Sequence, residues 1–171
     1  MKVQDTVRTQ LDFWHGTMEQ MLSETGDILH KSIDGSTTHS IAATYAHAVI
    51  AEDVIANTFL QGKAPLYQAG GWEAKLGIAF PGVPPALTPE WASSLKMDLP
   101  KFQEYAKAVY AATDAYLAAV ADTELDRTTQ GPFGETTIGW MVSALLATHP
   151  VGHAGEVAAL KGVHGLQGLP F

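Results

Sequence analysis

The stretch that decides the fold is Thr148-His149-Pro150-Val151-Gly152-His153-Ala154-Gly155-Glu156, near the end of the last helical pattern of the chain. Its two histidines are four residues apart and continue an apolar stripe that passes through Ile138 and Leu145. Positions i and i+4 stand one above the other on the same face of an α-helix, so both imidazoles are expected to point into the core. Buried imidazoles need partners for their ring nitrogens. One divalent metal, with a third ligand from elsewhere in the chain, would satisfy both rings.

Length and composition favour one helical domain. The chain has 171 residues, which is enough for a single domain, residues 1–171, with its own hydrophobic core. Because the sequence contains no cysteine, it can form neither a disulfide nor a thiolate metal site. The absence of cysteine fits a reducing compartment, and the first residues lack the profile of a signal peptide, so we expect a cytoplasmic protein.

Charge and hydropathy argue against two classes of partner. The formal net charge is −8 and the basic residues form no patch. Nucleic acid and anionic membrane surfaces are therefore poor candidate partners. No apolar run is long enough to span a bilayer. We expect a small-molecule substrate instead.

Four segments have the spacing of amphipathic or buried helices. Between the second and third segments lies a long connection, whereas the other connections are shorter. Short links make neighbouring helices antiparallel, and a long one lets the joined helices run parallel. The pattern therefore predicts an all-α, four-helix bundle of up-down-down-up topology. The predicted helices cover residues 6–24, 40–60, 99–121 and, beginning at Thr136 or Thr137, a segment that ends near Val163.

The long crossover, residues 63–100, is rich in proline and glycine and also carries many large apolar side chains. We expect it to be ordered and packed over the bundle, with short helical turns at 73–76 and 90–95. Long ordered loops are often functional lids, although a structural plug would have the same composition. Under the first interpretation Trp72 and Trp91 wall a ligand pocket; under the second they fill the core. Residues 122–135 are predicted to be a loop with a turn at 131–134.

The second helix supplies a third candidate imidazole. His47 lies on an apolar face that includes Ala43 and Val54, so it is expected to be internal. Glu52 and Asp53 are adjacent, and at least one of them should face solvent. Among the other histidines, His15 is expected to be a surface or boundary residue.

Three neutral imidazoles, from His47, His149 and His153, would form a strong ligand set for a first-row metal. Three protein ligands leave one position open for water or substrate, as in catalytic zinc sites. Zn, Ni, Mn and Fe are all compatible with this ligand set. A histidine pair at this spacing also occurs by chance, so a core in which the histidines are only hydrogen-bonded is the structural alternative.

These features together resemble the DinB/YfiT-like family of metalloenzymes. The resemblance rests on the lone helical histidine, the long crossover, the run from His149 to Glu156, and the ending Gly-Leu-Gln-Gly-Leu-Pro-Phe. It covers essentially the whole chain and is strongest over residues 138–171. It implies a four-helix bundle, often a homodimer, with a divalent metal on His47, His149 and His153. The family includes transferases and isomerases that use a low-molecular-weight thiol such as mycothiol, bacillithiol or glutathione.

Two residues depart from the family pattern. Many relatives have a further histidine immediately before the third ligand, where this chain has Gly152. Pro150 follows the second ligand, and a proline inside a helix costs about 3 kcal/mol. We expect the helix either to kink at this position or to restart with Thr148 as its cap.

The hypothesis favoured by the sequence is a divalent-metal-dependent enzyme, such as a thiol-dependent S-transferase, an isomerase or a hydrolase. The metal would activate a bound water or a thiol cosubstrate. Glu156 could orient a metal-bound imidazole, and Glu52 and Tyr45 are weaker candidates for proton transfer. The alternative is a non-catalytic dimeric bundle that binds a metal or a small ligand.

Overall fold

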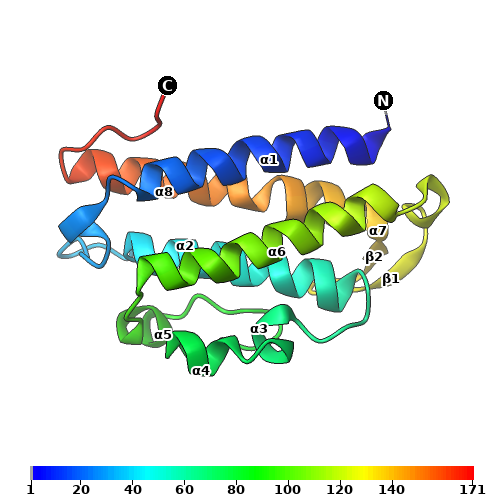
Figure 1. The fold of residues 1–171 in the computed structure, drawn as a ribbon, viewed down its shortest axis with the longest axis horizontal. Coiled ribbons are helices and arrows are strands. Elements are labelled where there is room, and N and C mark those ends of the chain that lie inside the picture. The colour runs from blue at the N-terminus through cyan, green and yellow to red at the C-terminus, as the bar shows by residue number, and fades with distance from the viewer. Residues whose placement is uncertain (1) are drawn as a thin grey trace.

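The computed structural model describes residues 2–171, which form mainly helices (Figure 1). This confirms the predicted helical fold class. Two of the four long helices change locally to the wider π-helical form. The long helices are α1 (Val3–Leu22), α2 (Ile41–Asp53) continued by the π-helical segment η2 (Val54–Phe59), α6 (Leu99–Ala119), and α7 (Ile138–Trp140) continued by the π-helical segment η4 (Met141–Ala147) into α8 (His149–Val163).

In the bundle, α1 and α2 each pack against both α6 and α8, so the first two helices lie on a diagonal. Figure 1 shows α2 and α6 running in one direction, while α1 and the α7–α8 rod run in the other. The long crossover therefore joins two helices that run the same way. As a consequence, α2 and α8 are antiparallel neighbours.

Polar side chains set the starts of the helices. The Ser40 hydroxyl accepts a hydrogen bond from the Ala43 N–H at 3.3 Å and caps α2. Asp98 caps α6 in the same way, with Pro100 in the first turn, where a missing N–H costs nothing. By contrast, α1 begins at Val3 rather than at residue 6, because its periodic pattern is preceded by residues that also fit a helix.

The crossover is ordered and contains short helices, as expected, and it is tied to the bundle by one carboxylate. Asp53 accepts hydrogen bonds from the backbone N–H groups of Leu66 and Tyr67, each at 2.8 Å, and from the Tyr105 hydroxyl at 2.7 Å. Both Glu52 and Asp53 are buried, so the expectation that one would face solvent was wrong. The helices of the crossover are α3 (Leu66–Ala69), α4 (Trp72–Leu76) and α5 (Pro89–Ser94).

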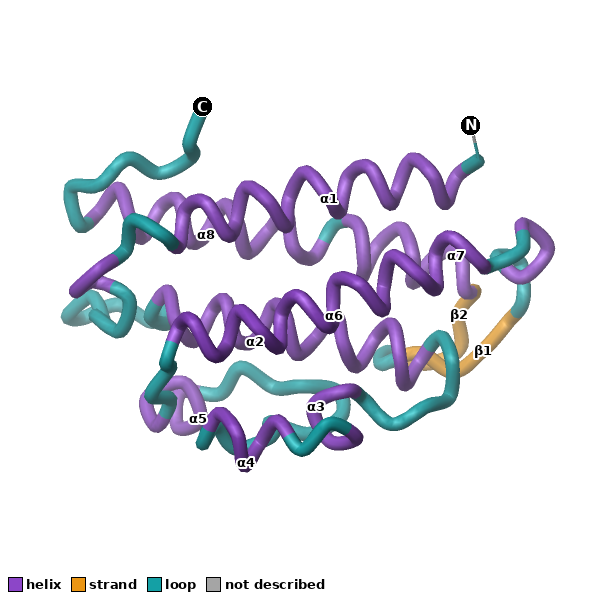
Figure 2. The backbone as a smooth tube through the Cα atoms, in the orientation of Figure 1, coloured by secondary structure: helices purple, strands orange, loops and turns teal. Residues whose placement is uncertain are grey.

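A small sheet follows α6, where the sequence had suggested only a loop. Strands β1 (Thr128–Gly131) and β2 (Gly134–Thr137) form an antiparallel hairpin at one end of the bundle (Figure 2). The predicted turn at 131–134 joins them, and Gly134 adopts a φ of 114°, which favours glycine. The β-branched threonines that face each other across the strands favour extended structure over a loop. Short 3₁₀ turns, η1 (Gly26–Ile28) and η3 (Asp122–Glu124), complete the fold.

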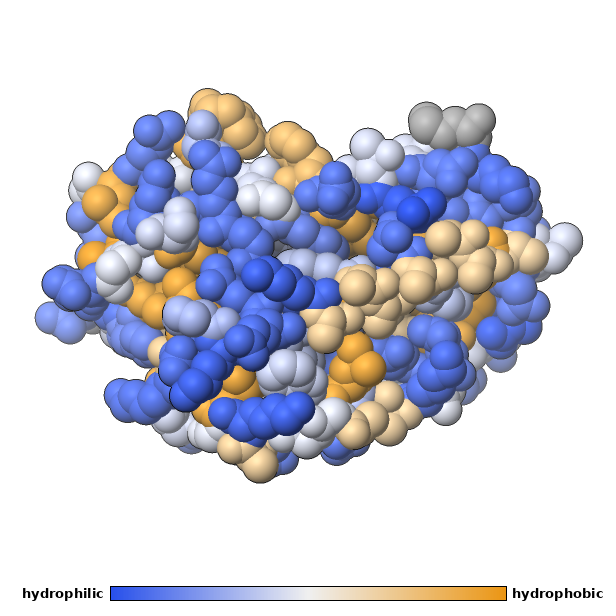
Figure 3. All heavy atoms as spheres, in the orientation of Figure 1, coloured by the Kyte–Doolittle hydropathy of each residue, from blue (hydrophilic) through white to orange (hydrophobic). Residues whose placement is uncertain are grey.

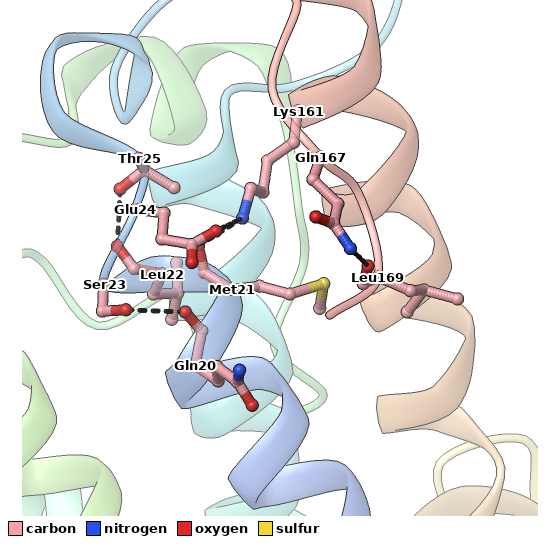
Figure 4. A network of polar contacts seen from close by, with 9 residues as sticks. All are labelled: Gln20, Met21, Leu22, Ser23, Glu24, Thr25, Lys161, Gln167 and Leu169. Carbon is pink, nitrogen blue, oxygen red and sulfur yellow. Dashed lines mark hydrogen bonds and ion pairs between the residues drawn. The ribbon is translucent and has the colours of Figure 1, made fainter. Parts of the chain in front are cut away.

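A buried lysine fixes α8 against the end of α1 (Figure 4). Lys161 is only 1% exposed, and its Nζ donates to the Met21 carbonyl at 2.9 Å and to Glu24 Oε2 at 3.1 Å. The C-terminal tail then returns over the helices, and the Phe171 ring lies 5.9 Å from that of Phe13. These contacts set the axial position of α8, which carries two of the histidines.

On the face of the molecule seen in Figure 3, hydrophilic side chains are interspersed with apolar ones. Among residues 2–171, no helix has both the length and the hydropathy needed to cross a membrane.

Candidate metal centre

Three histidines from two helices meet between α2 and α8. His47 projects from α2, and His149 and His153 project from the first turns of α8. The ring centroids are 5.3 Å apart for His47 and His149, 5.0 Å for His47 and His153, and 4.4 Å for the α8 pair. One nitrogen from each ring lies within 4.8 Å of the others. The predicted convergence is therefore confirmed, and this three-histidine group could hold a metal ion.

The π-helical segment η4 shows how the chain accommodates Pro150. Proline lacks an N–H, and its ring clashes with the carbonyl four residues earlier in a regular α-helix. The wider turns of η4 end at Ala147, and Pro150 then falls in the first turn of α8. Thr148 keeps helical dihedrals, and its hydroxyl donates to the Ser143 carbonyl at 2.9 Å instead of capping α8. The helix thus widens before the proline, and both histidines share the regular turns that follow.

Burial keeps two of the imidazoles neutral. It lowers the pKa of His47 to about 4, with a further contribution from the neighbouring His153 ring and an opposing one from Glu156. Burial also lowers the pKa of His149 to about 3, and the His153 and His47 rings act in the same direction. At neutral pH both rings therefore present a lone pair, which is the form that binds metals.

Glu156 fixes the orientation of the third imidazole. Its Oε2 lies 2.8 Å from Nδ1 of His153, one turn away on the same helix. A carboxylate accepts the hydrogen of Nδ1, which leaves the lone pair on Nε2. That Nε2 lies 3.0 Å from Nε2 of His149. The carboxylate therefore directs the His153 lone pair towards the other rings.

The donor set fits a divalent cation. Two imidazole nitrogens on one tetrahedral zinc lie roughly 3.3 Å apart, close to the separation observed between the α8 histidines. Nδ1 of His47 is buried without a hydrogen-bond partner, which is costly unless another group compensates. No carboxylate belongs to the three-histidine group, so a bound cation would keep its positive charge.

Glu52 and Tyr45, the weaker proton-transfer candidates, bind other groups. Glu52 Oε2 lies 2.8 Å from Nε2 of His15, and the Tyr45 hydroxyl donates to Glu19. His15 also stacks on Tyr110, with ring centroids 3.6 Å apart. His15 was expected at the surface or boundary, and its side chain, 14% exposed, is partly buried as a boundary residue would be. The one sequence signal for these contacts of His15 was the position of this residue next to the apolar stripe of α1.

The two crossover tryptophans pack as core residues. The Trp72 ring lies 5.4 Å from that of Tyr105, and Trp91 donates to the Ala79 carbonyl at 2.7 Å. Both are partly buried and border the main hydrophobic core. From the same crossover Leu87, which sequence reasoning missed, lines a cavity together with Glu156.

Comparison with known proteins gives a family and a fold. A family model described as DinB superfamily matches residues 6–157. The structure is similar to the crystal structure of a conserved protein from Enterococcus faecalis, with a TM-score of 0.82 and 20% sequence identity. The alignment covers 96% of this chain and 99% of that one. No curated protein matches the sequence.

Proposed function

Because this chain belongs to the DinB superfamily, we propose that it is a divalent-metal-dependent enzyme acting on a small molecule. The reaction class that we favour is a thiol-dependent S-transfer or isomerisation, with metal-assisted hydrolysis as the other chemistry of the same ligand set. The observation that carries the proposal is the meeting of three histidine nitrogens within 4.8 Å of one another.

His47, His149 and His153 would hold the cation, which when bound lowers the pKa of a coordinated water or thiol and so supplies a nucleophile at neutral pH. Each residue has a distinct task in this scheme. The buried rings of His47 and His149 stay neutral, since their pKa values are lowered to about 4 and about 3. Glu156 holds the His153 ring in one tautomer through Nδ1.

The charge balance of the group favours an anionic reactant. Three neutral imidazoles leave the charge of a divalent cation uncompensated, and the nearest carboxylate, Glu156, is bound to His153. A thiolate or another small anion is therefore preferred over a neutral or cationic reactant. Glu52 lies beside His15 in the core and is not needed for this chemistry.

Metal binding is the first test. Untagged protein is stripped with a chelator and titrated with Zn²⁺ or Co²⁺, and we expect one metal ion per chain. The His47→Ala variant should lose this binding. The exposed His30 lies outside the three-histidine group, so His30→Ala is the matched control and should keep the binding. A stoichiometric metal that remains in His47→Ala would remove this residue from the site and refute the proposal.

A second measurement separates catalysis from the alternative of a non-catalytic metal-binding bundle. Addition of a small thiol to the Co²⁺-loaded protein should produce a thiolate-to-cobalt absorption band, because an open coordination position accepts an external ligand. If the spectrum is unchanged at saturating thiol, the fourth position is closed and the bundle binds metal for stability or sensing.

A further inference from the structure

The side of α8 that carries the histidines continues beyond the three-histidine group. On α8, Glu156, Leu160 and Val163 follow His153 at steps of three or four residues, so all lie on one stripe. Because α2 and α8 are antiparallel (Figure 1), this direction leads towards the N-terminus of α2, where Thr44 lies one turn before His47. The stripe on α8 therefore runs from the histidines towards that end of the bundle.

A cavity of about 350 Å³ lies on this side of the histidines, and we name it the outer cavity. Thr44 and Glu156 line it, which places it one helical turn from the histidines on both helices. Glu156 is shared, since its carboxylate also contacts His153 at 2.8 Å. The volume is within the range of roughly 300–1,000 Å³ that is typical of small-molecule pockets. The outer cavity thus adjoins the three-histidine group through Glu156.

The walls of the outer cavity define the chemistry of its occupant. Ile33, Leu87, Leu160 and Val163 supply aliphatic surface from three different parts of the chain, with Leu160 and Val163 both on α8. Apolar walls favour an apolar body by roughly 25 cal/mol for each Å² removed from water. Glu156 is the one carboxylate among the described residues around the cavity, and His153 already engages it. No free negative charge on these walls opposes an anion.

We propose that the outer cavity receives the apolar body of a small molecule whose anionic head reaches the metal on the three-histidine group. This inference rests on the proposed function, because the head needs the cation. The thiolate or carboxylate would sit at the histidines, and a short aliphatic or aromatic body would extend past Glu156 towards Val163. Leu87 brings the crossover into the site as one wall.

The test compares straight-chain carboxylates, whose heads are identical and whose tails differ. Acetate, butyrate and hexanoate are titrated into the Co²⁺-loaded protein, and binding is followed by the cobalt absorption spectrum. We expect affinity to rise roughly two- to fourfold per added methylene, because each one is buried against the cavity wall. Equal affinity for acetate and hexanoate in the metal-loaded protein would overturn the proposal.

Two exposed positions allow the cavity to be altered without disturbing the fold. Val163 is 65% exposed, and Val163→Asp places a charge on the apolar wall. Ala159→Phe fills the space from α8. Both variants should keep the cobalt affinity of the wild type. They should lose the increase in carboxylate affinity that comes with a longer tail. Val3 is also exposed, at 62%, and lies at the start of α1. Val3→Asp is therefore the matched control and should retain the increase in carboxylate affinity with tail length.

The outcomes separate this inference from the proposed function. If Co²⁺ fails to bind, the proposed function fails, and hexanoate binding is then followed by methyl NMR in the metal-free protein. The absence of shifts at Leu160 and Val163 would refute the outer cavity as well. If Co²⁺ binds but the hexanoate preference persists in both Val163→Asp and Ala159→Phe, only the location of the tail is wrong.

Discussion

The molecule contains two histidine–carboxylate pairs of equal length in different surroundings. His153 Nδ1 lies 2.8 Å from Glu156, and His15 Nε2 lies 2.8 Å from Glu52. The Glu156 side chain is 58% exposed, whereas that of Glu52 is 4% exposed. The first pair lies within one helix, and the second crosses the bundle from α1 to α2.

The two pairs differ most in what surrounds the imidazole. The second nitrogen of His153 faces another imidazole at 3.0 Å, whereas the His15 ring stacks on Tyr110. A carboxylate on one nitrogen fixes the tautomer in both pairs. A metal site requires convergent lone pairs in addition, and only the His153 pair belongs to such a group among residues 2–171. We infer that the His15 pair stabilises the fold, whereas under the proposed function the His153 pair serves the metal site.

The largest effect should come from removing one of the metal ligands. We expect His149→Ala to weaken Zn²⁺ or Co²⁺ binding roughly a thousandfold, more than the 10–100-fold that follows from losing a residue that supports a ligand. His15→Ala should leave metal affinity nearly unchanged, because His15 lies outside the three-histidine group. Competition with a chromophoric chelator measures both affinities. Equal losses of metal affinity in the two variants would show that the two histidine–carboxylate pairs do not differ in their relation to the metal site.

Next in size is the effect of the buried carboxylate on folding. Glu52→Ala leaves His15 without its partner in the core, so we expect the free energy of unfolding to fall by about 2–4 kcal/mol. Glu156→Ala changes an exposed side chain and should cost less than about 0.5 kcal/mol in the metal-free protein. Urea denaturation of both variants gives the comparison. A larger loss for Glu156→Ala would reverse the roles assigned to the pairs.

For metal affinity we expect the opposite order, with a larger loss from substituting Glu156 than from substituting Glu52. Glu156→Ala is expected to weaken metal binding about 10–100-fold, because the His153 ring loses the group that sets its tautomer. Glu156→Gln keeps an oxygen that can accept the same hydrogen bond and should recover part of this loss. Calorimetric titration of the stripped variants measures the effect. Identical affinities in the wild type and both variants would show that Glu156 plays no part in the site.

A further effect is a pH dependence of stability. The pKa values of His47 and His149 are lowered in the folded protein, to about 4 and about 3, so below roughly pH 6.5 the unfolded chain binds more protons than the folded one. Their contribution is intact above that pH and is lost as the pH falls towards those values. The slope reaches at most about 1.4 kcal/mol per pH unit for each ring.

This dependence is measured by urea denaturation of the metal-free protein between about pH 7 and pH 4. Because carboxylates also titrate at the acidic end, the relevant quantity is the difference between wild type and His47→Gln, whose curve should be flatter. Parallel curves for the two proteins would mean that His47 is protonated as readily in the folded state as in the unfolded chain.

Much of the site could be read from the sequence because it depends on local geometry. The spacing of His149 and His153 places both rings on one helix face, and Glu156 follows at a distance that reaches His153. Periodicity also located the long helices to within a few residues. The widening at η4 was not foreseen, because a π-helical segment depends on how the neighbouring helices pack as well as on Pro150.

Several features that sequence reasoning missed join distant segments. Adjacent Glu52 and Asp53 were not expected to be buried together, since their partners, His15 for one and Leu66, Tyr67 and Tyr105 for the other, lie elsewhere in the chain. Leu87 became a cavity wall through the path of the crossover. Such contacts leave no periodic signal in the sequence.

The sequence by itself determined the helical class, the α8 histidine pair and the carboxylate that orients it, because each follows from the 3.6-residue turn of one helix. Only the tertiary structure decided that His47 meets that pair, that His15 meets Glu52, and that a cavity opens beyond Glu156. The rotation and axial position of each helix arise from packing the entire core, including the buried Lys161 contact, and no single segment of the chain encodes them.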